Sequence, residues 1–124
     1  MHPIDRFTST FVRISADTPV DVPTLYAPSI VFADPAHRVE GVEALAAYFA
    51  RLDANLVEAR FEFHEEVRGE RSAALRWRMH ARLRFPPGRT VDVEGTSWLQ
   101  HDGTHITAQT DHFDLGALVY EQVP

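Results

Sequence analysis

The segment LRWRMHARLR, residues 75–84, is the clearest indication of the fold, because its apolar side chains alternate with basic ones. A period of two places successive side chains on opposite faces of a β-strand. Residues 57–64, VEARFEFH, alternate in the same way, and Gly69-Glu70 can form the hairpin turn between the two stretches. Two further strands are expected at residues 91–100 and 106–113, preceded by turns at 86–88 and 101–104. Strands joined by such short turns predict an antiparallel meander.

Helical patterns come before this meander. Apolar side chains recur at helical spacing over residues 4–14 and again over 45–56, and Asp21 can begin a short helix that ends near Tyr26. A short strand is expected at residues 30–32, and a final helical turn at 115–120. Helices gathered on one side of a meander predict an α+β roll, in which the concave face of a curved sheet and the helices enclose a pocket. We expect residues 1–124 to form one domain.

The composition excludes several kinds of chemistry. The chain has no cysteine, which excludes disulfides and thiolate sites, and its 12 basic residues are all arginine, which excludes a Schiff-base lysine. A net charge of −6 argues against nucleic acid as a partner. No apolar run reaches the ~20 residues of a membrane span, and no stretch has the character of a signal peptide. We therefore expect a cytoplasmic protein without a membrane partner, a metal or another cofactor.

Three segments resemble the nuclear transport factor 2-like superfamily. They are LYAPSIVFADP at 25–35, VEGVEAL at 39–45 and ITAQTDHFDL at 106–115, the last of which is similar to the final strand of SnoaL-like proteins and limonene-epoxide hydrolases. The resemblance, together with the element order, covers nearly the whole chain. It implies the cone-shaped roll, a fold that hosts isomerases, dehydratases, cyclases, hydrolases and proteins without catalytic activity.

The ketosteroid isomerase relatives provide one set of implied site residues. Their catalytic aspartate, in an Asp-Pro step, corresponds to Asp34. Their two oxyanion donors fall at Ser97 and near Thr10 or Phe11, which are different residue types. The resemblance thus implies a general base at Asp34. It does not supply the two oxyanion donors, because other residue types stand at their positions.

Limonene-epoxide hydrolase provides a second set. Its catalytic aspartate–arginine–aspartate group falls at His80, Arg78 and Asp111, and its water-positioning tyrosine and asparagine fall at Phe32 and Asp34. Two members of the set are retained and three are changed. The resemblance implies the same pocket walls with altered chemistry.

An argument from strand register leads to the same residues. If each hairpin closes symmetrically, Arg78 lies opposite Gly95, Gly95 lies opposite Asp111, and His80 shares their face. A glycine on the middle strand would let the guanidinium reach the carboxylate. The predicted catalytic residues are Asp34 as base, Asp111 and His80 as proton partners, and Arg78 as the group that orients Asp111. The predicted substrate-binding residues are Phe32, Phe49, Phe61, Phe63, Ser97 and Phe113.

Each of these features also has a purely structural interpretation. Arg78 and Asp111 can form an ion pair that holds the sheet, Asp34 can cap a turn, and His80 can lie on a solvated face. The sequence favours a cofactor-free enzyme that uses acid–base chemistry on a small, largely apolar substrate, by isomerisation, dehydration, cyclisation or epoxide opening. The alternative is a non-catalytic domain that binds a small molecule or mediates dimerisation.

The same register also predicts an assembly. If Arg78 and His80 face the pocket, the apolar residues of the strand must face outward. These are Leu75, Trp77, Met79, Ala81 and Leu83, and Trp98 of the next strand would join them. An exposed apolar row of this size predicts a twofold homodimer through the outer sheet face, with Trp77 and Met79 near its centre.

Overall fold

The computed structural model describes residues 1–114, and the predicted helical turn at 115–120 lies outside them. The helices are α1 (Pro3–Phe11), α2 (Val22–Leu25) and α3 (Val42–Asp53). The strands are β1 (Ile14–Ser15), β2 (Tyr26–Ala33), β3 (Arg38–Glu40), β4 (Leu56–Arg68), β5 (Ser72–Leu83), β6 (Thr90–His101) and β7 (Ile106–Phe113). The predicted elements within residues 1–114 are present, and β2 is longer than expected.

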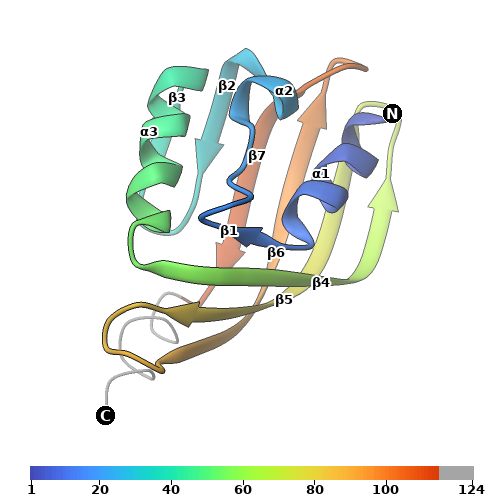
Figure 1. Ribbon diagram of the computed structural model, residues 1–124. Helices are drawn as coiled ribbons and strands as arrows, with labels where there is room; N and C mark the ends of the chain where they lie inside the picture. The colour runs from blue at the N-terminus through green and yellow to red at the C-terminus, as the bar shows by residue number, and fades with distance from the viewer. Residues whose placement is uncertain (115–124) are drawn as a thin grey trace.

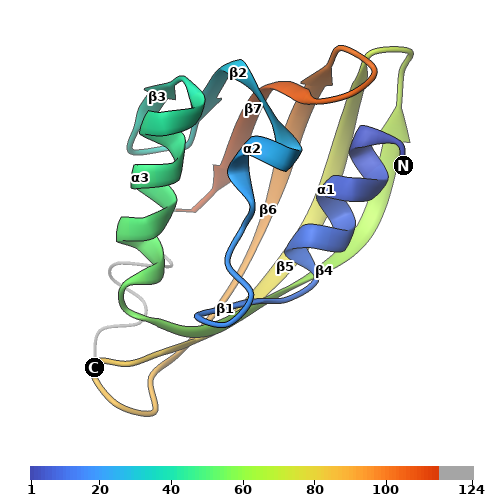
Figure 2. The same cartoon turned by 45° about the horizontal axis from the view of Figure 1, so that its top comes forward.

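The strands form one curled sheet in the order β1-β4-β5-β6-β7-β2-β3. Strands β4 to β7 make the predicted antiparallel meander, whereas β2 pairs parallel to β7. The three helices lie on the concave side of the sheet, with α1 across β4 and β5 and α3 beside β2 (Figures 1 and 2). The predicted α+β roll is confirmed.

Helix α1 begins where its first turn is capped. The His2 side chain accepts a hydrogen bond from the Ile4 amide, and Pro3 occupies the first turn, where its missing N–H costs nothing. The apolar stripe of the helix, Ile4 with Phe7 and Phe11, is buried against the sheet. This burial places α1 over one end of the concave face.

Helix α3 covers the opposite end. Gly41, with φ +90°, lets the chain turn from β3 into the helix. Leu45 and Tyr48 are buried on its inner stripe, and Phe49 lies beside them in the aromatic core. The two helices therefore flank a space above the centre of the sheet.

The predicted register of the meander is wrong by one residue at β5. Trp77, not Arg78, pairs with Gly95, and Gly95 in turn pairs with Phe113. Arg78 pairs with Glu94 instead. The turns are centred on other residues than predicted: Gly69 bonds to Ser72, Arg82 pairs with Thr90, and His101 pairs with Ile106. Register shifts between Phe63 and Glu65 and between Gln100 and His101 add further offsets. A shift of one residue exchanges the two faces of a strand.

Arg78 and His80 consequently lie on the outer, convex face. Arg78 donates to Asp92 over 2.7 Å and to Glu94 over 3.0 Å. His80 Nε2 lies 3.1 Å from a Glu62 carboxylate oxygen. The expected pairing of Arg78 with Asp111 is wrong, because the two side chains are on opposite faces.

The apolar side chains of β5 point into the molecule instead. Leu75, Trp77 and Ala81 are buried, which removes the outward row on which the dimer prediction rested. Trp98 does lie outside, 60% exposed, as expected. A homodimer through the outer face stays a prediction, and Trp77 and Met79 cannot form its centre.

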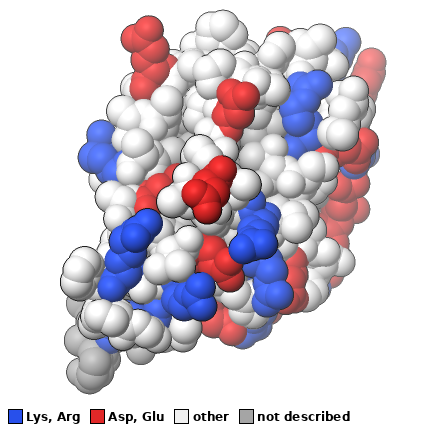
Figure 3. All heavy atoms as spheres, in the orientation of Figure 1, with Lys and Arg blue, Asp and Glu red and all other residues white. Residues whose placement is uncertain are grey.

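Charged side chains of both signs are interspersed on the helix side of the molecule (Figure 3). This face carries no continuous basic surface. Within residues 1–114, no helix is long and apolar enough to cross a membrane.

Candidate functional site

A cavity of about 440 Å³ lies between the concave face of the sheet and the helices. This volume is within the range of about 300–1,000 Å³ that small-molecule sites occupy. Most of its wall is apolar and comes from the inward row of β5 and its neighbours. Typical members are Ala59, Phe61, Trp77, Met79, Val93 and Phe113. Four of the side chains predicted to form an outer patch, Trp77, Met79, Ala81 and Leu83, are thus part of the pocket wall.

The polar side chains of the cavity come from the α3, β2 and β7 side. They are Asp34, His37, Tyr48, Asp53, Gln109 and Asp111. Three of the six are carboxylic acids, and none of the described residues that line the cavity is an arginine. The site therefore offers carboxyl, phenol, amide and imidazole groups in an apolar enclosure, without a permanent positive charge.

Asp111 lies at the bottom of this cavity. Its Oδ1 accepts hydrogen bonds from Ser97 Oγ over 2.7 Å and from Gln109 Nε2 over 3.0 Å. Burial raises the pKa of Asp111 from its ordinary 3.8 to about 6, against the opposing effect of these two hydrogen bonds. The negative charge of Asp34 adds to the rise. A carboxyl group with this pKa can exist in both protonation states near neutral pH.

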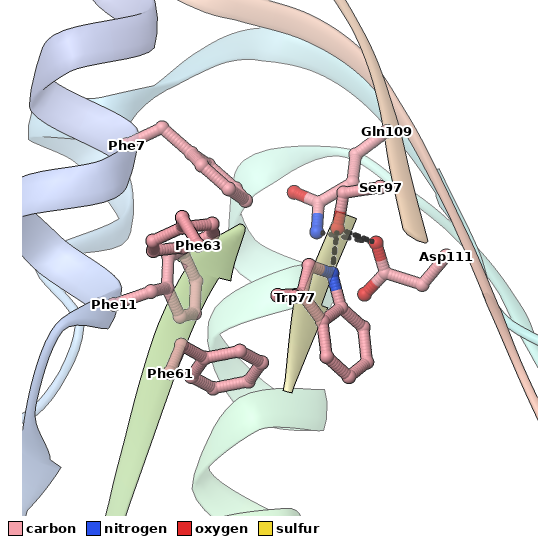
Figure 4. Close-up of a pocket in the computed structure, with 8 residues that line it drawn as sticks. All are labelled: Phe7, Phe11, Phe61, Phe63, Trp77, Ser97, Gln109 and Asp111. Carbon is pink, nitrogen blue, oxygen red and sulfur yellow. Dashed lines mark hydrogen bonds between the residues drawn. The ribbon is translucent and has the colours of Figure 1, made fainter. Parts of the chain in front are cut away.

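Two chains of hydrogen bonds lead to Asp111. In one, which Figure 4 shows, the Trp77 indole donates to Ser97 over 2.9 Å, and Ser97 donates to Asp111. In the other, the buried Tyr26 hydroxyl donates to Gln109 over 2.6 Å, and Gln109 donates to Asp111. Side chains from β2, β5, β6 and β7 therefore hold a single carboxyl group in place.

Asp34 occupies a different setting at the end of β2. Its Oδ1 accepts hydrogen bonds from the backbone amides of Ala36 and His37, at 2.9 and 2.8 Å, and its Oδ2 accepts one from the Tyr48 hydroxyl. The turn-capping interpretation is therefore confirmed. Burial, together with the hydrogen bond and charge of Asp34, raises the pKa of Tyr48, so this phenol stays protonated.

The predicted site residues divide into three groups. Asp34, Asp111, Phe32, Phe49, Phe61 and Phe113 line the main cavity. Ser97 and Phe63 line a small adjoining cavity of about 20 Å³, beside Phe7 and Phe11. Arg78 and His80 belong to neither cavity. The structure thus brings eight of the ten predicted residues to one region and excludes the two whose position depended on the register of β5.

Six residues with polar groups at the site were not predicted from the sequence: Tyr26, His37, Tyr48, Asp53, Trp77 and Gln109. Tyr48 and Trp77 were recognised as apolar members of a helix stripe and a strand row, so their hydroxyl and N–H groups received no role. Gln109 lies two residues before Asp111, and side chains two apart on a strand share a face. That spacing was a signal that could have identified it.

Solved structures with the same fold include three that span nearly the whole chain. One is a protein from Rhodopseudomonas palustris provisionally assigned as an isomerase, with a TM-score of 0.83 and 18% identity over 98% of this chain and 96% of that one. Another is a ketosteroid isomerase-like protein from Catenulispora acidiphila in complex with trimethylamine, with a TM-score of 0.79 and 17% identity over 98% and 93%. The third is an LEH-like epoxide hydrolase from M. tuberculosis, with a TM-score of 0.73 and 14% identity over 97% and 85%. At these identities the similarity establishes the fold alone.

Sequence comparison establishes the family. Among proteins of curated function, none matches the sequence significantly. The sequence profile of the SnoaL-like domain matches residues 6–109, which is most of the chain. The chain belongs to the SnoaL-like domain family, whose nuclear transport factor 2-like fold includes cyclases, isomerases and epoxide hydrolases.

Proposed function

We propose that this SnoaL-like protein is a cofactor-free enzyme that transfers protons on a small, uncharged, largely apolar substrate. The observation that carries the proposal is the setting of Asp111. Its carboxyl group has a pKa of about 6 and borders an apolar cavity of about 440 Å³. A general acid or base is most effective when its pKa is close to the working pH.

The lining of the cavity supports an uncharged substrate. An anionic substrate would meet Asp34, Asp53 and Asp111 without an arginine among the described lining residues. Removing such an anion from water would cost several kcal/mol without a compensating ion pair. The apolar wall from β4 to β6 favours a hydrocarbon skeleton, and the polar side favours one or two oxygen atoms at one end of it.

The chemistry needs no group beyond the side chains. Ionised Asp111 can accept a proton from a carbon next to a carbonyl group, and the resulting carboxylic acid can return that proton to another carbon or to a departing oxygen. Isomerisation, dehydration and aldol-type cyclisation contain a proton transfer of this kind. In epoxide opening the base takes the proton of an attacking water molecule, and the departing epoxide oxygen receives a proton. Asp34 with Tyr48 lies on the same cavity and is the second proton-transfer group of the proposal.

The structural relatives are consistent with this reaction class. They include the provisionally assigned isomerase, an LEH-like epoxide hydrolase and a protein provisionally assigned as a SnoaL-like polyketide cyclase from Jannaschia. Isomerisation, epoxide opening and cyclisation are three of the four reactions considered above. The relatives do not distinguish among them for this chain.

Turnover of a defined substrate panel tests the proposal. The panel contains one apolar member of each class: a β,γ-unsaturated ketone, a β-hydroxy ketone, a diketone able to cyclise and an epoxide. We expect turnover of at least one class and a loss of about 10²–10⁴-fold in Asp111→Asn, because the proton-transfer group is removed. We expect Asp34→Asn to lose activity as well.

Asp92→Asn is the matched control, because Asp92 is a carboxylate on the outer face and lies outside the cavity. It should retain wild-type turnover. Absence of turnover of the whole panel, or full activity in both Asp111→Asn and Asp34→Asn, would overturn the catalytic proposal.

A non-catalytic binding domain is the second candidate. The observation that favours it is that the three hydrogen bonds accepted by the Asp34 carboxylate come from within the fold, two of them from the backbone of its own turn. Calorimetric binding of the same panel separates the two functions. A binding domain would bind a member without converting it, and Asp111→Asn would alter the affinity only.

A further inference from the structure

The two hydrogen-bond chains that end on Asp111 have a defined direction. The indole N–H of Trp77 can only donate, so the oxygen of Ser97 must accept from it. The single hydroxyl hydrogen of Ser97 is then free to point at Asp111, 2.7 Å away. The donor-only indole therefore sets the orientation of Ser97.

The second chain is directed in the same way. Gln109 has one amide oxygen and one NH₂ group, and the Tyr26 hydroxyl donates to the oxygen. The NH₂ group must then face Asp111, to which it donates over 3.0 Å. The opposite amide orientation would point a carbonyl oxygen at an ionised carboxylate, which is repulsive.

Both chains end on the same oxygen of Asp111. Oδ1 receives the Ser97 and Gln109 hydrogen bonds, whereas no described residue donates to Oδ2. Asp111 borders the main cavity as well as the small one beneath it. An oxygen that already accepts two hydrogen bonds is a poor site for a proton, so a proton on this carboxyl group is directed to Oδ2.

We propose that Ser97 and Gln109 are positioning residues, held by Trp77 and Tyr26, that reserve Oδ2 of Asp111 for proton exchange with the substrate. The inference rests on the proposed function and adds to it the oxygen atom that reacts and the residues that select it. It also explains why the polar residues Ser97 and Gln109 are buried in a largely apolar core, at 1% and 3% exposure.

The charged and titratable groups that face Asp111 are few. Asp34 acts on it across the cavity and raises its pKa, and His112 on the same strand lowers it. The phenols of Tyr26 and Tyr48 stay neutral because burial raises the pKa of each. The titration of Asp111 therefore responds mainly to burial and to the two donors on Oδ1.

The test measures the titration of Asp111 directly, by ¹³C NMR of protein labelled at the aspartate carboxyl carbons, with Asp111→Asn to identify the signal. Ser97→Ala removes one donor to the ionised form. We expect its apparent pKa to rise by about one pH unit or more above the wild-type value. Gln109→Leu should shift it in the same direction, and Thr96→Ala, next to Ser97 on the outward side of β6, should not shift it.

Trp77→Phe distinguishes positioning of Asp111 by Ser97 from general loosening of the core. It leaves the Ser97 hydroxyl in place, so we expect a smaller pKa change than in Ser97→Ala but a larger fall in the thermal midpoint, since more packing is lost. An unchanged pKa of Asp111 in Ser97→Ala, or a larger pKa change in Trp77→Phe than in Ser97→Ala, would overturn the proposed positioning role. Because no substrate is used, this result is independent of whether the panel is turned over.

Discussion

The two faces of β5 carry opposite kinds of side chain. The inward residue Trp77 is 4% exposed, packs against Phe61 with 5.0 Å between ring centroids and donates to Ser97. The next residue, Arg78, lies outside and pairs with Asp92 and Glu94 of β6. One face thus builds the cavity, and the other is a set of ion pairs in solvent.

The comparison shows that composition alone does not reveal which face of a strand is functional. Arginine and histidine next to aspartate resembled an active-site cluster, yet on β5 Arg78 forms ion pairs with surface carboxylates and His80 lies beside Glu62 and Asp92. The apolar row resembled an interface, yet it forms the pocket wall. Exposed ion pairs contribute little to stability, whereas buried aromatic side chains contribute much.

Replacing the same residue type on the two faces should produce the largest difference. Trp77→Ala removes a buried indole, its ring contacts and its hydrogen bond, and we expect it to lower the free energy of unfolding by about 3–5 kcal/mol. Trp98→Ala, on the outer face and 60% exposed, should change it by less than about 0.5 kcal/mol. Urea denaturation measures both, and similar losses would contradict the assignment of faces.

The buried carboxyl group should make stability depend on pH. The pKa of Asp111 is raised in the folded state to about 6 from 3.8, so the folded protein binds this proton more tightly than the unfolded chain does. The resulting stabilisation is fully present below about pH 4 and is lost as the pH rises through about 6; it amounts to at most about 3 kcal/mol.

Denaturation of wild-type protein and Asp111→Asn between pH 4 and 8 measures this contribution. The difference between the two curves should change over the interval from about pH 4 to 6 and be flat above it. The difference curve is needed because the pKa of Asp102 is lowered and so contributes in the opposite direction in acid. A difference that does not vary with pH would show that Asp111 is not perturbed by burial.

Gly95 allows the inner face to be perturbed at its closest contact. A Cβ atom at this position would lie 2.5 Å from the Trp77 ring and 2.7 Å from the His112 carbonyl oxygen. We expect Gly95→Ala to cost about 1–3 kcal/mol by overpacking. Adding Trp77→Phe should recover part of this loss, because the contacted atoms belong to the outer ring of the indole. Additive losses in the double variant would contradict the contact.

The smallest effects are expected on the outer face. Arg78→Gln and His80→Gln remove the two residues that the register argument had placed in the site. Because both lie outside the cavity, we expect turnover of any substrate found with the panel to change by less than about twofold. A loss comparable to that of Asp111→Asn would return these residues to the mechanism and contradict the observed register.

The predicted site residues differ in how far their placement depended on the register of the meander strands. Asp34 was identified from the resemblance to known relatives, and Asp111 from that resemblance and the register of the last hairpin; both lie on the cavity. Arg78 and His80 required three hairpins to be centred where predicted, and each is centred on other residues. In the last hairpin, for example, Asp102 accepts hydrogen bonds from the amides of Thr104 and His105, so His101 pairs with Ile106. Displacements of this kind accumulate along a meander.

Most helices and strands, their order and the α+β roll could be predicted from the chain, because apolar periodicity and turn residues are local properties. The resemblance to known relatives added a pocket with Asp34 and Asp111. Only the tertiary structure decided which face of β5 lines that pocket, because one residue of slip leaves the alternation unchanged and exchanges every side chain. It also decided the directed contacts around Asp111, since these join residues of four strands whose relative register no local pattern specifies.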